Sequence, residues 1–406
     1  MWELIRLNKR NSVILFLVMA AVLIGLGIII GAAVHPNGLI LGGLVALVVW
    51  LVLATISLSS GDQILLAASR ARPVTKQVHP QLFNVVEEMT IAAGLSRMPR
   101  IYIIDDPAPN AFATGRGPQT ASIAVTAGLL AKLNRDELQG VVAHEISHIL
   151  HRDILYVTLA GVMLGAIVLI SDLFLRGVFR SSAYGSSRRY SAQARRTPAQ
   201  VQLVIILLAV AAAILAPILA QLLYLALSRQ REYLADAGAA RLTRYPEGLA
   251  SALEKIANDP GPQLSVATKA TAPMYIVNPF KRGLGYLTST HPPITERIRI
   301  LRSIGNSVSW AQYAKAYTQV TKRSLPYRLH DEPLPVRPGQ EAGPVASPSA
   351  QHRQAGDLIR RMNGFRFLTC PCGLVLKIPP NYTLGHIKCP RCDRLLDVPE
   401  PALASR

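Results

Sequence analysis

The chain has 406 residues, half of them hydrophobic, and carries 43 Lys and Arg against 24 Asp and Glu, a formal net charge of +19. This length accommodates two or three domains, and a mean hydropathy of +0.29 excludes a purely soluble protein. The positive charge is compatible with nucleic acid, an anionic membrane surface or the cytoplasmic flanks of membrane spans, and the last is favoured in a chain with several spans.

Two apolar runs at 13–34 and 38–58 contain no charged residue and predict transmembrane helices, because about 20 such residues cross the hydrocarbon core. The first run is longer than the apolar region of a signal peptide, roughly 7 to 15 residues, which favours an uncleaved anchor. Lys and Arg residues flank the pair on its outer sides and are absent from the connecting loop 35–37. The N-terminus and the segment after Leu58 are therefore expected to face the cytoplasm.

Residues 59–134 predict a small α/β unit, with a helix near 79–95, a strand at 100–105, a turn at 105–110 and an alternating segment at 121–130. Asn134 is typical of a helix N-cap, and Glu137 three residues later completes the pattern of a capping box. A helix is therefore expected from about Arg135 to about Leu150.

This helix carries the sequence HEISH at 144–148. His144 and His148 are four residues apart, so they lie on one helical face and can both direct a ring nitrogen at one tetrahedral zinc ion. Glu145 can reach a zinc-activated water without being a ligand, which suits a general base in peptide hydrolysis. The alternative is a chance HExxH on the charged face of a surface helix, which a third ligand would exclude.

Two more apolar runs follow at 155–175 and 201–227, and both have the length of a membrane span although polar residues interrupt them. The segment between them, 176–200, contains six arginines and no acidic residue, which disfavours an extracytoplasmic location. The two runs therefore either cross the membrane or form a hairpin that does not cross, and their length favours crossing.

The sequence SRQREYLAD at 228–236 supplies the candidate third ligand. Glu232 can complete a His-His-Glu zinc site, and Asp236, one turn later on the same helical face, can accept the ring N–H of a ligating histidine. Alternatively, both carboxylates only pair with neighbouring arginines as an exposed charged face. Because these ligands lie close to the apolar runs, the metal is expected about 10 Å from the membrane boundary.

The C-terminal part divides into segments of different composition. Residues 228–320 are expected to be mostly helical, whereas 326–356 are rich in Pro, Gly, Ser and Ala and predict an extended flexible linker. All four cysteines of the chain follow, namely Cys370, Cys372, Cys389 and Cys392. Their clustering indicates a reduced compartment and a structural zinc site of the ribbon type. The spacing of the first pair is one residue shorter than usual. His386 is a substitute ligand or, as we favour, a loop residue.

Four stretches together resemble the HtpX-type membrane zinc proteases, relatives of the CAAX prenyl proteases within the gluzincins. They are NAFATG at 110–115, HEISH at 144–148, SRQREYLAD at 228–236 and STHPPITERIRIL at 289–301, and the resemblance covers roughly residues 1–325. It implies an ATP-independent zinc endopeptidase in quality control of membrane proteins. His144, His148 and Glu232 are then the zinc ligands, and Glu145 is the catalytic base.

The resemblance also implies two further elements of the site. The segment that begins with Asn110, Ala111 and Phe112 leads an edge strand that pairs with an extended substrate by β-augmentation. His291 resembles a histidine that steadies the oxyanion, and the alternative is that it only begins a helix with the two prolines that follow it. The four-cysteine module is not required by a protease of this type.

The expected fold is a multi-pass α-helical membrane protein with a mainly helical gluzincin domain that contains a small sheet. It comprises a membrane hairpin at 1–58, a protease domain at 59–325 that includes the helices 155–175 and 201–227, a linker at 326–356 and a zinc-ribbon-like module at 357–406. We expect it in a bacterial-type inner membrane, in contact with the lipid bilayer and with its active site facing the cytoplasm.

The expected substrates are proteins or peptides, above all misfolded membrane proteins, and the expected cofactors are one catalytic and one structural zinc ion. Nucleic acid is not an expected partner, because few aromatic residues accompany the basic residues of the C-terminal module. The ribbon could instead bind a protein. The competing function is a non-catalytic zinc scaffold, which would need the ligands but not Glu145.

Overall fold

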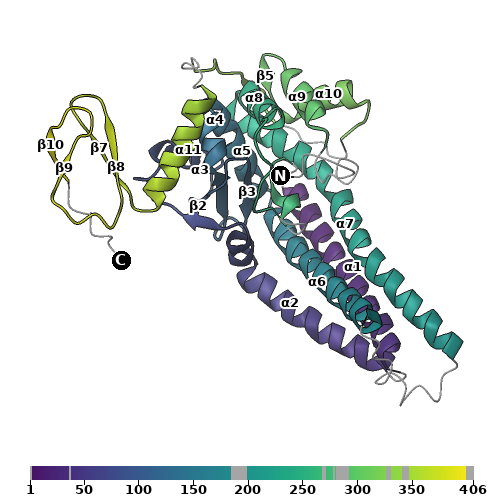
Figure 1. Cartoon of the computed structure of the whole chain (residues 1–406). Helices are drawn as coiled ribbons and strands as arrows, with labels where there is room; N and C mark the ends of the chain where they lie inside the picture. Colours follow the sequence, from purple (N-terminus) through teal and green to yellow (C-terminus); the bar gives the residue numbers. More distant parts are fainter. Residues whose placement is uncertain are drawn as a thin grey trace.

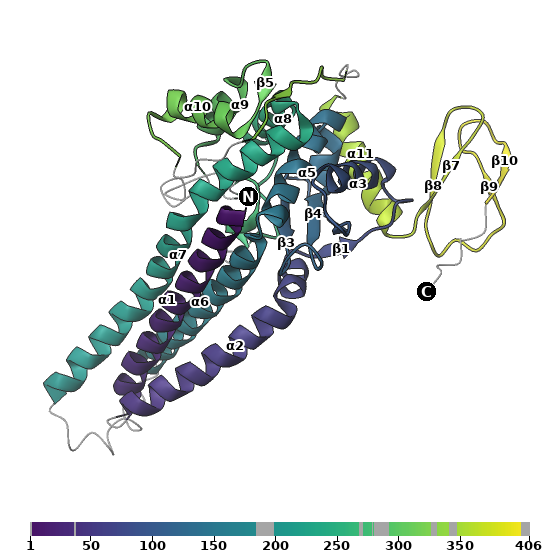
Figure 2. The same ribbon diagram turned by 180° about the vertical axis from the view of Figure 1, so that it is seen from behind.

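A computed structural model describes residues 2–35, 38–183, 199–267, 271–277, 279, 292–325, 331–340 and 347–398. Long helices extend to one end of the molecule, and a sheet surrounded by shorter helices lies at their other end (Figure 1). Short strands near the C-terminus form a small separate unit beside the sheet-containing part (Figures 1 and 2). The described part of the chain is thus mostly helical with small sheets, as the sequence predicts.

The long helices are α1 (Trp2–Val34), α2 (Gly38–Ala68), α6 (Ile154–Ala183) and α7 (Ala199–Thr243). Three stretches among the described residues are long and apolar enough to span a membrane, namely Val13–Val34, Gly38–Ala68 and Leu203–Ala220. Large apolar side chains along α2 and this part of α7 are exposed, as lipid-facing side chains would be. The predicted runs at 13–34, 38–58 and 201–227 thus contain candidate spans, and a crossing at 155–175 stays a prediction.

Glycines allow α1 and α2 to approach each other closely. A Cβ atom at Gly31 would lie 2.2 Å from the carbonyl oxygen of Gly38, and one at Gly42 would lie 2.3 Å from the carbonyl oxygen of Gly27. Small residues spaced by four along both helices are the usual means by which membrane helices bring their backbones together. The two helices therefore form a tight hairpin around the short connection between them.

The largest sheet contains β1 (Ala71–Pro73), β2 (Arg100–Ile104), β3 (Ala111–Thr114) and β4 (Ser122–Thr126). Its strand order is β1-β2-β4-β3, in which β2 and β4 are parallel and the other pairs are antiparallel. Strand β3 is therefore an edge strand of this sheet. One face of the sheet packs on α3 (Pro80–Ala92) and α5 (Arg135–Leu150), and the other face on the end of α2 and residues 264–267 and 274–275.

Helix α5 lies between α3, α7 and α8 (Pro246–Ala257). Pro80 and Pro246 occupy the first turns of α3 and α8, where the missing N–H costs no hydrogen bond. The chain continues through the short helix η2 (Ala272–Met274), α9 (Ile294–Arg302), β5 (Ser307–Val308) and α10 (Trp310–Thr321). The short helix α4 (Ala127–Lys132) joins β4 to α5. These elements bury α5 almost completely.

The segment 326–356 differs from the expected extended linker wherever it is described. Strand β6 (Leu334–Pro335) pairs antiparallel with β5, and helix α11 (Pro348–Met362) begins within the segment at the N-cap Ser347. Leu358 of this helix is buried in the main core. Pro and Gly suit ordered irregular segments as well as flexible ones, so composition alone could not separate the two. Residues 326–330 and 341–346 lie outside the described residues.

The C-terminal module consists of two hairpins, β7 (Arg366–Thr369) with β8 (Val375–Ile378), and β9 (His386–Lys388) with β10 (Leu395–Asp397). Two contacts join it to α11. Lys377 Nζ lies 2.6 Å from Asp357 Oδ1, and the Arg361 guanidinium lies over the ring of Phe367 at 4.9 Å from its centroid. The module is thus attached to a helix that is itself part of the main core.

Candidate metal centre

The start of α5 matches the predicted capping box. Asn134 Oδ1 accepts a hydrogen bond from the Glu137 amide at 2.9 Å, and the Asn134 amide donates to Glu137 Oε2 at 2.8 Å. Lys255 of α8 also lies 2.8 Å from Glu137 Oε2, so the cap fastens α5 to the neighbouring helix. The cap thus fixes where α5 begins and how it lies against α8, and with them the placement of His144 and His148.

The structure brings together the three predicted ligands from α5 and α7. The Nε2 atoms of His144 and His148 are 3.1 Å apart, and each lies 3.7 Å from a carboxylate oxygen of Glu232. Tetrahedral zinc with ligand bonds of 2.0–2.1 Å separates its ligand atoms by roughly 3.3 Å. The three side chains thus already have nearly the spacing that one zinc ion requires.

A carboxylate lies at the other ring nitrogen of each histidine. His144 Nδ1 is 3.0 Å from Asp236 Oδ1, and His148 Nδ1 is 2.9 Å from Asp153 Oδ2. Such partners hold the proton on Nδ1 and direct the Nε2 lone pair at a metal. Arg152, with φ at 57°, ends α5 by a sharp turn that brings Asp153 back to His148. Asp236 lies where the helical spacing predicts it.

The centre carries an excess of buried negative charge. Four carboxylates are almost inaccessible to solvent. The buried guanidinium of Arg297 contacts two of them, Glu232 and Asp236. The carboxylates belong to Glu145, Asp153, Glu232 and Asp236. Buried charges of one sign are costly unless cations compensate them. The donor set and its charge therefore both fit a divalent cation bound by imidazole and carboxylate.

The pKa values of the site follow from this burial and charge. Burial raises the pKa of Glu145 to about 8, and the backbone N–H of Ala113 opposes the rise by hydrogen bonding to its carboxylate. Burial lowers the pKa of His144, whereas Asp153 and Glu232 overcome the effect of burial at His148 and raise its pKa to about 9. A positive charge is thus favoured next to His148, where a proton and a metal ion compete for Nε2.

Arg297 is a site residue that the sequence reasoning missed. Its Nε and Nη2 atoms donate to the two oxygens of Asp236 at 2.8 and 2.7 Å, and its Nη1 lies 3.5 Å from Glu232. A signal was present, because Arg297 shares the buried face of α9 with Ile300 and Leu301 at helical spacing. An arginine on an apolar helical face needs a buried acidic partner.

The predicted substrate strand lies beside the metal centre, but its edge is occupied at both ends. Just beyond β3, Thr158 Oγ1 donates a hydrogen bond to the carbonyl oxygen of Gly115 at 3.3 Å. The carbonyl oxygen of Ala111 accepts a hydrogen bond from the Ile276 amide at 2.9 Å, and Asn110 Nδ2 donates to the carbonyl oxygen of Val277 at 2.9 Å. Phe112 is fully buried on the sheet face, at 5.1 Å from the ring of Tyr275. His291, the predicted oxyanion residue, lies outside the described residues.

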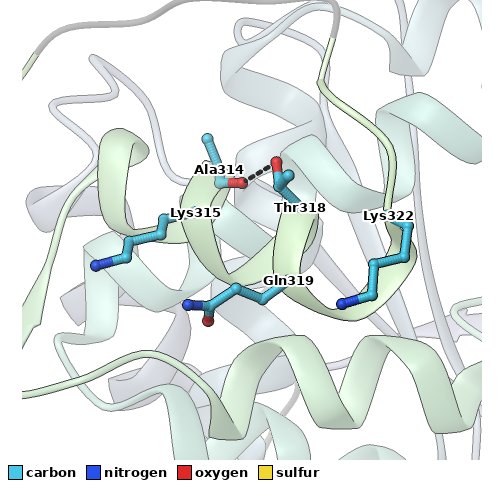
Figure 3. Close-up of a pocket in the computed structure, with 5 residues that line it drawn as sticks. All are labelled: Ala314, Lys315, Thr318, Gln319 and Lys322. Atoms are coloured by element: carbon cyan, nitrogen blue, oxygen red, sulfur yellow. Dashed lines mark hydrogen bonds between the residues drawn. The ribbon is translucent and has the colours of Figure 1, made fainter.

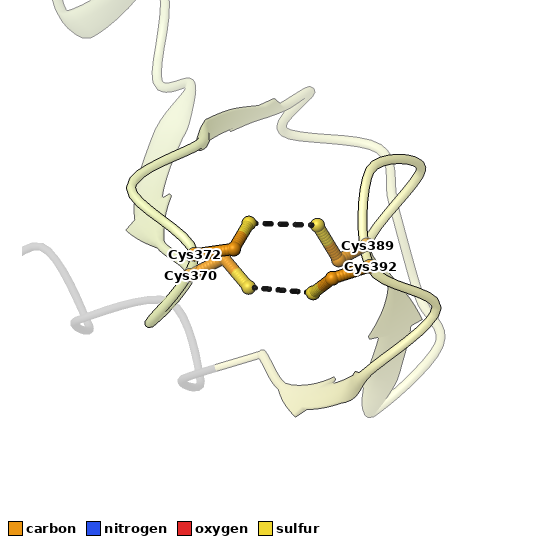
Figure 4. Close-up of side chains that lie close together, drawn as sticks. All are labelled: Cys370, Cys372, Cys389 and Cys392. Atoms are coloured by element: carbon orange, nitrogen blue, oxygen red, sulfur yellow. Dashed lines mark hydrogen bonds between the residues drawn. The ribbon is translucent and has the colours of Figure 1, made fainter.

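The four cysteines of the C-terminal module also form a cluster (Figure 4). Cys370 Sγ lies 3.5 Å from Cys392 Sγ, and Cys372 Sγ lies 3.7 Å from Cys389 Sγ. Zinc–sulfur bonds of about 2.3 Å give sulfur separations of roughly 3.8 Å in a tetrahedral site. The shorter first pair therefore still presents both thiols inward. His386 is exposed and pairs with Asp397 at 2.6 Å, away from this ligand set.

A shallow surface pocket lies on α10 and its C-terminal cap (Figure 3). It is lined by Ala314, Lys315, Thr318, Gln319 and Lys322, none of which belongs to either candidate metal centre. Its side chains come from one helix, and a single surface helix offers no convergent groups of the kind that ligand pockets use. We assign this pocket no role.

Comparisons with known proteins identify the family to which the chain is similar. A profile of peptidase family M48 matches residues 76–305. The chain is 46% identical over 304 residues to a protease HtpX homolog of Dictyoglomus thermophilum, which covers 75% of this chain and 95% of that protein. It is 53% identical over 245 residues to the homolog of Dictyoglomus turgidum, covering 60% of this chain and 76% of that protein. The homolog of Streptococcus mutans is 38% identical over 298 residues. This alignment covers 73% of this chain and 97% of that protein.

A solved structure also resembles the chain. It is the crystal structure of S. mikatae Ste24p, with a TM-score of 0.38 and 21% sequence identity, covering 74% of this chain and 67% of that one.

Proposed function

Because the chain belongs to peptidase family M48 and is an HtpX-type metalloprotease, we propose that it is a membrane-bound zinc endopeptidase whose metal is held by His144, His148 and Glu232. The observation that carries this proposal is the convergence of two imidazole nitrogens and one carboxylate on a single point. A non-catalytic zinc scaffold would not need the buried carboxylate of Glu145 next to that point.

Glu145 acts as the general base in the proposed mechanism. When bound, zinc polarises the scissile carbonyl and makes the attacking water more acidic. The Glu145 carboxylate accepts the proton of that water and returns it to the leaving amine. A pKa raised by burial suits a group that must both take and give a proton near neutral pH. Asp236 and Asp153 keep the two histidines in the tautomer that leaves Nε2 unprotonated.

The substrate is proposed to lie extended along the outer edge of β3. Two features support this placement, namely the edge position of β3 and the closeness of the Ala113 backbone N–H to the Glu145 carboxylate, whose pKa it lowers. Since Ile276 occupies the carbonyl oxygen of Ala111 and Thr158 occupies that of Gly115, pairing would centre on Ala113. Main-chain pairing of this kind reads few side chains, so it supports broad specificity. His291 is proposed to steady the oxyanion.

The protease is proposed to act on misfolded membrane proteins at the cytoplasmic face of a bacterial-type inner membrane. The candidate spans in α1, α2 and α7 support attachment to a membrane. Glu232 lies only twelve residues beyond Ala220, the last residue of the third candidate span. The active site would thus meet segments that leave the bilayer. The four cysteines are proposed to bind a second, structural zinc ion.

Metal removal tests the proposed function. Detergent-solubilised full-length protein is expected to cleave casein, to lose this activity in excess chelator and to regain it with stoichiometric zinc. Magnesium should not restore activity, because it prefers oxygen ligands in octahedral geometry. Cleavage that persists in chelator, or that is equal in a parallel preparation of Glu145→Gln, would show that the activity belongs to another protein.

The two topologies of the apolar runs at 155–175 and 201–227 differ in the location of Ser186. A single cysteine introduced at Ser186 is expected to react with an impermeant thiol reagent on intact cells if both runs cross. The parent chain is the background control, because its own cysteines would face the cytoplasm. A cysteine at Asn37, on the expected outer side, is the positive control. Labelling at Asn37 with protection at Ser186 would support the hairpin that does not cross.

A further inference from the structure

The geometry of the proposed metal site depends on how two helices sit against each other. Helix α5 supplies His144 and His148, and helix α7 supplies Glu232, so a small shift of one helix along the other would separate the ligands. The two helices pack directly on each other. Residues 331–340, hereafter the arm, join the start of α5 to the end of α7. The arm follows the region matched by the family profile.

Arg337 is the centre of this junction. Its Nη2 donates to Asp136 Oδ1 at 2.7 Å and to Gln139 Oε1 at 2.6 Å, both in the first turns of α5. Its Nε donates to the carbonyl oxygen of Thr243, the last residue of α7, at 2.9 Å. One planar guanidinium therefore holds the start of one ligand-bearing helix and the end of the other.

Other contacts hold the arm on both sides of Arg337. The Gln340 amide donates to Asp136 Oδ2 at 2.7 Å, and the Arg337 amide donates to the carbonyl oxygen of Arg244 at 2.9 Å. Asp331, at the other end of the arm, lies 2.9 Å from Arg241 of α7. The arm is thus bound to α7 through Asp331 and Arg337 and to α5 through Arg337 and Gln340. The β5–β6 pairing lies between Asp331 and Arg337.

The burial of these groups makes the junction stronger than a surface ion pair. Asp136 and Gln139 are buried, and the Arg337 side chain is 21% exposed. Charge-assisted hydrogen bonds away from bulk water are shorter and stronger than exposed ones, and only arginine has a rigid fork that can reach three acceptors in fixed directions. The Arg337 guanidinium also lies over the ring of Tyr245 at 4.9 Å from its centroid.

We propose that Arg337 is a positioning residue for the catalytic metal, which fixes the placement of α7 against α5 and thereby the distance from Glu232 to the two histidines. This inference rests on the proposed zinc site. Asp136 precedes His144 by eight residues and Thr243 follows Glu232 by eleven, distances of about 12 and 16 Å along helices. The effect is carried by two stiff, packed helices and not by contact with the metal.

The test compares zinc affinity in full-length wild type, Arg337→Gln and Arg337→Lys by competition with a chelator, at a temperature where each variant is fully folded. Arg337→Gln should weaken the catalytic site roughly 2- to 30-fold, the range found for changes remote from a ligand. Arg337→Lys should give a smaller loss, because it keeps the charge without the fork. Activity measured at saturating zinc should recover in both variants with unchanged KM, because the arm does not touch β3.

Two controls make the outcomes distinct. The His144→Ala chain identifies the zinc that belongs to the four-cysteine module, and Arg302→Gln removes a two-carboxylate pairing at the exposed α8–α9 surface. A catalytic zinc affinity equal to wild type in Arg337→Gln, with only a lower unfolding temperature, would overturn the inference, as would an equal loss in Arg302→Gln. If wild type itself binds zinc only at the cysteines, the proposed function fails instead.

Discussion

Glu145→Gln is expected to lower kcat for casein cleavage by a factor on the order of 10² to 10⁴ while zinc content stays at the wild-type level. The amide has nearly the volume of the carboxylate but cannot accept the proton of the attacking water. Glu145 is only 2% exposed and lies next to the ligand set without belonging to it, so the fold and the metal should tolerate the change. Steady-state kinetics and metal analysis of the same preparation provide the two measurements.

Glu87→Gln is the matched control for this variant. Glu87 is an exposed glutamate of α3 whose nearest cation, Lys76, is 3.8 Å away, so the same chemical change there should leave kcat unchanged. Wild-type activity in Glu145→Gln would remove Glu145 as the base. Loss of zinc together with activity would instead show that Glu145 supports metal binding.

Glu232→Ala is expected to reduce the metal content of the full chain from two zinc ions to one and to abolish activity. The remaining histidines cannot retain zinc at the concentration that saturates wild type, because a structural or catalytic site needs at least three protein ligands. The metal-free protein should nevertheless fold, since the substitution removes one of four buried carboxylates that repel one another. Metal analysis after gel filtration measures the first effect.

Thermal unfolding separates the loss of metal from the loss of fold. Zinc stabilises a folded site by about 2.7 kcal/mol at one hundred times its dissociation constant. The increase in unfolding temperature on adding zinc should therefore be smaller in Glu232→Ala than in wild type. The control Glu247→Ala, which removes an exposed partner of Arg302, should keep two zinc ions. Two zinc ions in Glu232→Ala would exclude it as a ligand.

Local patterns were sufficient to predict the parts of the site that lie on single helices. Asn134 and Glu137 are three residues apart, His144 and His148 four apart, and Glu232 and Asp236 four apart. In each case the helical repeat itself brings the side chains together. The meeting of α5 and α7 required the further assumption that two motifs far apart in the chain share one metal. Their chemistry supported that assumption, because neither motif alone completes a zinc site.

Contacts between distant segments were not predictable in the same way. Nothing local to Ile276 indicates that its amide occupies the carbonyl oxygen of Ala111, and nothing local to Arg337 indicates Asp136 as its partner. Such pairs depend on how separate elements pack. Helix α11 is an intermediate case, because Ala355, Leu358, Ile359 and Met362 have helical spacing and could have indicated a buried face. The Pro- and Gly-rich composition just before them favoured a linker.

The attachment of the cysteine module to α11 has a consequence for whatever that module binds. A module on a flexible tether would sample a large volume, and the local concentration of its cargo would depend on chain length. Here Leu358 anchors the helix in the main core, and Asp357 and Arg361 hold the hairpins to the same helix. A bound molecule would therefore be presented at one distance and in one orientation. Its size and shape, and not only its affinity, would decide whether a cleavable segment reaches Glu145.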